Sequence, residues 1–103
     1  MRIDHFLIVA RLVECESAGS RMLSEREQFA LGQEVVKARE ALRLFRQAAE
    51  PEDYESSKSV YVINGVGGGN RYAVRRNGEV ELSKSHASPA MLAHCERVGF
   101  PTY

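Results

Sequence analysis

The chain has 103 residues, of which 44% are hydrophobic and 27% charged, and its 14 basic and 14 acidic side chains cancel. This length and composition are typical of one globular domain with its own core, and they exclude an intrinsically disordered chain. The balanced charge also excludes binding to nucleic acid or an anionic membrane through an overall positive field. Any such contact has to come from a local patch.

The cysteine content and the N-terminal sequence favour a cytoplasmic protein. Cys15 and Cys95 are too few for the disulfide framework of a small secreted domain, so we expect two reduced thiols, with one Cys15–Cys95 bridge as the alternative. The apolar run at residues 6–10 is too short for the core of a signal peptide or for a membrane span. We therefore expect no contact with a membrane.

Residues 2–14 have two interpretations. The apolar run at residues 6–9 lacks alternation, which favours a strand that is buried on both faces. Residues 10–12 fit a helix equally well. We expect a strand, which would give the sheet a fourth member, followed by a loop over residues 15–21.

The next segment predicts a long amphipathic helix from Ser24 to about Ala49. Ser24 followed by Glu27 is the pattern of a capping box, and Pro51 ends the helix. Its apolar side chains fall within a sector about 140° wide, which predicts a face packed on the core. These core-facing residues are Ala30, Leu31, Val35, Ala38, Ala41, Leu42, Phe45, Ala48 and Ala49.

A second apolar feature lies on the opposite side of this helix. Phe29 and Val36 are seven residues apart, and Gly32 between them leaves a notch. Either the N-terminal segment covers these side chains, or they form a contact surface for a second copy of the chain or another protein. We take Phe29, Gly32, Val36 and Arg43 as the candidate partner-binding residues.

The second half of the chain predicts a β-meander. An acidic connector over residues 51–58 separates it from the long helix, and the meander occupies residues 59–85. Strands are expected at 59–64, 71–76 and 79–83, because these runs are rich in β-branched and aromatic residues and are bounded by turn residues.

The register of the second hairpin follows from its hydrophobic pattern. A three-residue turn that ends with Gly78 in a left-handed conformation pairs Val74 with Val80 and Tyr72 with Leu82. A two-residue turn would mix charged and apolar side chains on both faces. Because a slip of one residue exchanges the two faces, we expect the three-residue turn.

The last element is a short helix over residues 88–99. Ser88 is its expected N-cap, Pro89 its first residue and Gly99 its C-terminal stop. Its expected inward side chains are Met91, Cys95 and Val98, with Phe100 packed back against them. The chain is therefore expected to be a single α+β domain over residues 1–103, with a long amphipathic helix on a three- or four-stranded antiparallel sheet and a short C-terminal helix.

No motif predicts catalysis, a metal or a cofactor. The glycine-rich run at residues 65–70 leads into a strand, whereas a phosphate-binding loop leads into a helix N-terminus. The adjacent His94 and Cys95 project about 100° apart on a helix and do not easily share a zinc ion. We expect no catalytic residue, no metal, no cofactor and no enzymatic activity.

A local positive excess marks the predicted sheet. The candidate nucleic-acid-binding residues are Arg71, Arg75, Arg76 and Lys84. Aromatic side chains among arginines on a sheet can bind single strands, but the expected register places Tyr72 on the apolar face, away from these arginines. It also places Glu79 opposite Arg75, which favours an ordinary solvated face with ion pairs.

These observations favour a non-enzymatic protein-binding module. It would act as a regulator, adaptor or inhibitor by occupying the surface of a protein partner that the sequence does not identify, and self-association as a homodimer is one form of such contact. Accessory proteins of bacteria and their phages include small domains of this kind. The alternative is a nucleic-acid-binding protein that uses the basic sheet face.

Overall fold

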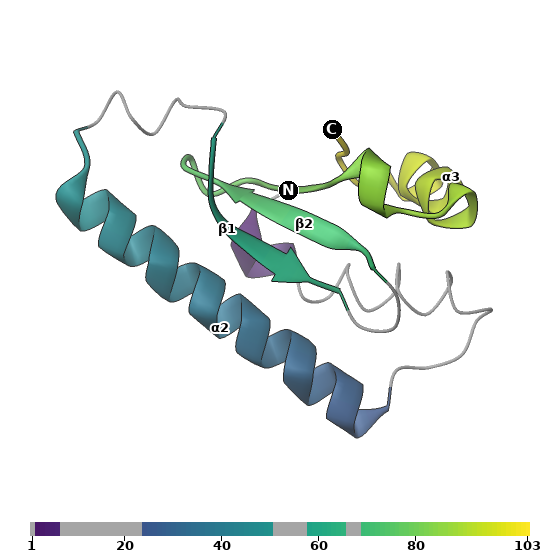
Figure 1. The fold of residues 1–103 in the computed structure, drawn as a ribbon, viewed down its shortest axis with the longest axis horizontal. Helices are drawn as coiled ribbons and strands as arrows, with labels where there is room; N and C mark the ends of the chain where they lie inside the picture. Colours follow the sequence, from purple (N-terminus) through teal and green to yellow (C-terminus); the bar gives the residue numbers. More distant parts are fainter. Residues whose placement is uncertain (1, 7–23, 51–57, 66–68) are drawn as a thin grey trace.

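The computed structural model describes residues 2–6, 24–50, 58–65 and 69–103. It shows an α+β fold in which a long helix packs against a three-stranded antiparallel sheet. In Figure 1, α2 runs along the sheet and α3 lies beyond the end of the sheet that is away from the β2–β3 turn. The elements are α2 (Glu25–Ala48), β1 (Ser59–Asn64), β2 (Arg71–Arg75), β3 (Val80–Leu82), the 3-10 helix η2 (Lys84–His86) and α3 (Pro89–Val98).

The sheet is a meander in the order β1-β2-β3, and its second hairpin has the predicted register. Tyr72 pairs with Leu82 and Val74 with Val80. The turn between them ends at Gly78, which has a φ of 91°. A left-handed glycine at this position forms the bulge that keeps all four paired side chains on one face.

The first hairpin closes around the glycine-rich loop. Asn64 pairs with Arg71 at the end of the two strands, and the Gly65 amide donates a 2.9 Å hydrogen bond to the Asn70 carbonyl. The loop therefore joins two antiparallel strands, as predicted. Residues 66–68 lie outside the described part of the chain.

The core lies between α2 and the apolar face of the sheet. The buried side chains of α2 are Leu31, Val35, Ala38 and Leu42. The sheet contributes Ile63, Tyr72, Val74, Val80 and Leu82, which are fully buried.

The core-facing side of α2 is shorter than predicted at both ends, because Ala30 and Ala48 are exposed. A helix of 24 residues is about 36 Å long, whereas a strand of six residues extends only about 20 Å. The two ends of α2 therefore extend beyond the sheet.

The predicted N-terminal strand is wrong for the residues that are described, because residues 3–6 are helical. The outer edge of β3 is occupied by the end of the chain instead, through a 2.9 Å bond from the Leu82 amide to the Pro101 carbonyl and a 3.0 Å bond from the Tyr103 amide to the Leu82 carbonyl. The N-terminal residues pack into the core, where the Phe6 ring lies 4.9 Å from the Tyr72 ring. Residues 7–14 and the predicted loop at 15–21 lie outside the described part of the chain.

The caps of α3 agree with the prediction. The Ser88 hydroxyl accepts a 3.1 Å hydrogen bond from the Met91 amide, and Gly99 is left-handed with a φ of 76°. Met91 and Cys95 are buried, and Cys95 is a free thiol.

The inward assignment of Val98 is wrong, because this side chain is 50% exposed. Val98 is the last residue of α3, and the chain reverses at Gly99 directly after it. The Phe100 amide then donates a 2.8 Å bond to the Cys95 carbonyl, and the buried Phe100 ring packs in the core.

Candidate functional site

The outer face of α2, formed by Phe29, Gly32 and Val36 with Arg43 two turns further on, is exposed. Phe29 is 69% exposed and Val36 is 56% exposed. A Cβ built on Gly32 meets no atom of the described residues within 4 Å, so a notch separates the two side chains. The described N-terminal residues lie elsewhere, since the Ile3 amide bonds to the Gly78 carbonyl at the β2–β3 turn.

The Arg43 side chain is turned along the helix toward Glu40. Its Nε donates to Oε2 at 3.0 Å and its Nη2 to Oε1 at 2.5 Å. The hydrogen bond from Arg43 lowers the pKa of the Glu40 carboxyl, and the same contact raises the pKa of Arg43. Along the outer face of α2, the apolar notch at Gly32 is therefore followed by the Glu40–Arg43 ion pair.

The four candidate nucleic-acid-binding residues do not form one surface. Arg71 and Arg75 alternate with Tyr72 on β2 and so lie on the face of the sheet opposite α2, here called the open face. Arg71 is exposed there, whereas only 17% of the Arg75 side chain is exposed. Arg76 turns the other way, with its guanidinium carbon 5.1 Å from the centre of the Phe45 ring on α2. Lys84 is exposed and lies in η2, beyond β3.

One aromatic residue that the sequence analysis missed does lie on the open face. The guanidinium carbon of Arg75 stacks 4.3 Å from the centre of the Tyr103 ring, and its Nη2 lies 3.8 Å from Oε2 of Glu81. Tyr103 is placed there by the pairing of the last residues with β3, for which no local sequence signal exists. Tyr72 is fully buried, as its predicted position on the apolar face requires.

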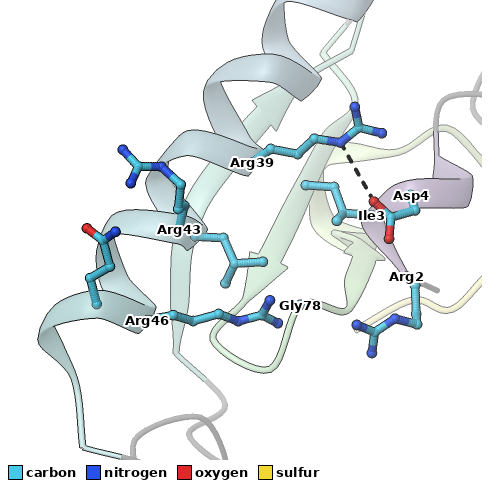
Figure 2. Close-up of a pocket in the computed structure, with 9 residues that line it drawn as sticks. Arg2, Ile3, Asp4, Arg39, Arg43, Arg46 and Gly78 are labelled. Carbon is cyan, nitrogen blue, oxygen red and sulfur yellow. Dashed lines mark ion pairs between the residues drawn. The ribbon is translucent and has the colours of Figure 1, made fainter.

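A cleft with four arginines lies beside the β2–β3 turn, on the side of the sheet that faces α2. It has a volume of about 390 Å³ and is formed by the N-terminal residues, the C-terminal half of α2 and the turn itself. Figure 2 shows the guanidinium groups of Arg2 and Arg46 approaching Gly78 from two sides. The described residues of this arginine cleft are Arg2, Ile3, Asp4, Arg39, Leu42, Arg43, Arg46, Gln47 and Gly78.

Hydrogen bonds and ion pairs fix part of this cleft. The Arg46 Nη2 donates to the Asn77 carbonyl at 3.3 Å, and the Arg39 Nε lies 3.9 Å from Oδ1 of Asp4. The three arginines of α2 follow one another at spacings of four and three residues, which places them on one side of the helix. The approach of Arg2 to the same place was not predictable, because it depends on the packing of the chain's first residues against a distant turn.

Within the described residues, no three histidine, cysteine or acidic side chains converge as metal ligands do. The His86 Nδ1 lies 2.9 Å from the Ser83 hydroxyl and 3.2 Å from the Ser85 hydroxyl, contacts that brace the short helix η2. The buried His94 has its Nδ1 3.3 Å from Nη2 of Arg97.

None of the helices in the described segments has the length and apolar character needed to cross a bilayer.

Comparison with known proteins found no family model, curated protein or solved structure that matches this chain. The candidate sites are the outer face of α2, the open face of the sheet and the arginine cleft.

Proposed function

We propose that the chain is a non-enzymatic, cytoplasmic protein-binding module that acts as a regulator, adaptor or inhibitor by occupying a partner's surface. The observation that carries this proposal is the exposure of Phe29 (69%) and Val36 (56%) on the side of α2 that faces away from the core. Single apolar side chains are common on protein surfaces, but two at helical spacing on either side of a glycine notch form a shaped surface.

A second copy of the chain is the occupant that this surface fits best. In an antiparallel pair of α2 helices with the two-fold axis beside Gly32, Phe29 of each copy lies opposite Val36 of the other. Gly32 allows the two helices to approach closely at that point. The same arrangement places Glu25 of one copy opposite Glu40 of the other, and the Arg43 that pairs with Glu40 offsets part of the repulsion between these two carboxylates.

The expected association is weak. Burial of a Phe or Val side chain contributes about 1.5–3 kcal/mol, and the symmetric contact buries two of each. The loss of translational and rotational freedom opposes association by about 4–15 kcal/mol. The two contributions are of similar size, so self-association is expected only at high protein concentration.

The test is the mass of the purified protein by light scattering as its concentration rises. The wild-type mass should increase from one chain toward two, whereas Phe29→Asp and Val36→Asp should remain at one chain and stay folded by circular dichroism. Val98→Asp is the matched control, because Val98 is a similarly exposed valine on α3. If both α2 variants unfold, or if they associate as the wild type does, the outer face of α2 is not the contact surface.

The alternative function, binding of nucleic acid to the open sheet face, is favoured by the Arg75–Tyr103 stack of 4.3 Å. A salt titration with a single-stranded oligonucleotide separates the two functions, because binding driven by phosphate contacts weakens steeply as salt rises. Tight binding that is lost in Arg71→Gln and Tyr103→Ala would favour this alternative.

A further inference from the structure

The arginine cleft brings positive charge together from two ends of the sequence. Its described lining residues include four arginines, of which Arg39 lies near the Asp4 carboxylate and Arg43 is paired with Glu40 outside the cleft. The opposite end of the cleft, at the β2–β3 turn, holds Arg2 and Arg46. Like charges gathered in one hollow repel each other, and a bound anion relieves that repulsion.

The geometry at the turn allows one anion to contact both arginines. A Cβ built on Gly78 would lie 2.8 Å from Nη2 of Arg46 and 3.9 Å from Nη2 of Arg2, so the two guanidinium groups approach the same point. Figure 2 shows them reaching this point from opposite walls of the cleft. The glycine at residue 78 leaves the space that a side chain would fill.

The floor of the cleft is apolar. Ile3 is 6% exposed and Leu42 is 4% exposed, so both are held firmly in the core beneath the arginines. A volume of about 390 Å³ is within the range of small-molecule sites, which combine an apolar lining with a few charged groups. The cleft therefore has room for an organic group beside an anionic one.

The geometry points to a binding site for a small phosphate-bearing molecule, with its phosphate between Arg2 and Arg46 and the rest of the molecule over Ile3 and Leu42. Guanidinium groups bind phosphate oxygens through paired N–H donors, and a phosphate monoester has nearly two negative charges at neutral pH, which attract neighbouring arginines. This site is distinct from the proposed protein-binding face, apart from Arg43, which lies at the border of both.

The test is a titration of the isotope-labelled full chain followed by backbone amide NMR. The probes are sodium pyrophosphate and adenosine monophosphate, with sodium sulfate as the reference anion, all at the same ionic strength. The proposal predicts that both phosphate compounds shift the amides of Ile3, Leu42 and Gly78 at lower concentration than sulfate does. Binding should weaken by at least about tenfold in Arg2→Gln and in Arg46→Gln, since each removes a charge-assisted hydrogen bond.

Arg71→Gln is the matched control, because Arg71 is an exposed arginine on the open sheet face. Arg2→Lys keeps the charge but loses the paired donors, so its affinity should fall between those of the wild type and Arg2→Gln. Equal responses to pyrophosphate and sulfate, or equal weakening in Arg71→Gln, would overturn the proposal. It would also be overturned if a single-stranded oligonucleotide shifted these amides and neither phosphate compound did.

Discussion

The Tyr61 hydroxyl on β1 donates a 2.9 Å hydrogen bond to Oε2 of Glu34 on α2. The other carboxylate oxygen of Glu34 lies 3.6 Å from Nζ of Lys37, one turn further along the helix. The Tyr61–Glu34 hydrogen bond joins the first strand to the middle of α2. Phe29 and Val36 face outward because the opposite side of the helix carries the buried side chains of the core, Leu31, Val35, Ala38 and Leu42.

Removal of this hydroxyl should destabilise the protein modestly. Tyr61→Phe keeps the ring in place and removes the hydrogen bond, so we expect a loss of about 0.5–1.5 kcal/mol in the free energy of unfolding by urea. Tyr103→Phe is the control, because the stacking of Arg75 on the Tyr103 ring does not need the hydroxyl. A Tyr61→Phe variant as stable as the wild type would show that a hydrogen bond from water to Glu34 stabilises the protein as much as the one from Tyr61.

The same hydrogen bond should make part of the stability depend on alkaline pH. Burial raises the pKa of the Tyr61 phenol, and the hydrogen bond and negative charge of Glu34 raise it further. A raised folded-state pKa gives stability that is complete below the ordinary value of about 10 and is lost as the pH rises through the folded-state value. The stability difference between wild type and Tyr61→Phe should therefore be constant at neutral pH and shrink above about pH 10. A difference that grew with pH would contradict the direction of this shift.

The two glycines Gly78 and Gly32 should respond to alanine in opposite ways. Gly78 has a φ of 91°, and an added Cβ would lie 2.8 Å from Nη2 of Arg46, so Gly78→Ala should cost about 1–2 kcal/mol. Gly32 lies inside α2, and no atom in the described part of the chain is within 4 Å of an added Cβ, so Gly32→Ala should stabilise the fold by about 0.5–1 kcal/mol. Thermal unfolding measures both changes.

Gly32→Ala also tests the outer face of α2, because it fills the notch without harming the helix. If two α2 helices meet there, the variant should be more stable as a monomer and yet associate more weakly. Equal association of Gly32→Ala and wild type would show that close helix approach is not needed at this point.

The phenylalanines Phe6 and Phe29 form a second matched pair. Phe6 is fully buried between the rings of Tyr72 and Phe100, whereas Phe29 is 69% exposed. Phe6→Ala should cost about 3–5 kcal/mol, and Phe29→Ala should change the free energy of unfolding by less than about 0.5 kcal/mol. Urea denaturation separates these outcomes. A large cost at Phe29 would place it in the core and remove the basis of the proposed contact surface.

The elements that could be predicted from the sequence are those set by local chemistry. The capping box at Ser24 and the Ser88 and Gly99 caps depend on hydrogen bonds within a few residues. The register at Val74 and Val80 could be derived because only one turn length keeps the apolar side chains on one face.

The features that could not be predicted depend on which distant segments meet. The N-terminal apolar run fits a strand by composition, but the last residues of the chain occupy the outer edge of β3, where Leu82 bridges Thr102. The stack of Arg75 on Tyr103 follows from that same pairing. The arginine cleft likewise requires Arg2 and Arg46 to meet at one turn, and no local pattern encodes this.

The most direct test of the proposed contact is an isotope-filtered NOE measurement on a concentrated mixture of labelled and unlabelled chains. Contact between the outer faces of two α2 helices predicts intermolecular NOEs from the Phe29 ring protons of one chain to the Val36 methyl groups of the other. Their absence at millimolar concentration, or intermolecular NOEs only to residues outside the outer face of α2, would contradict it.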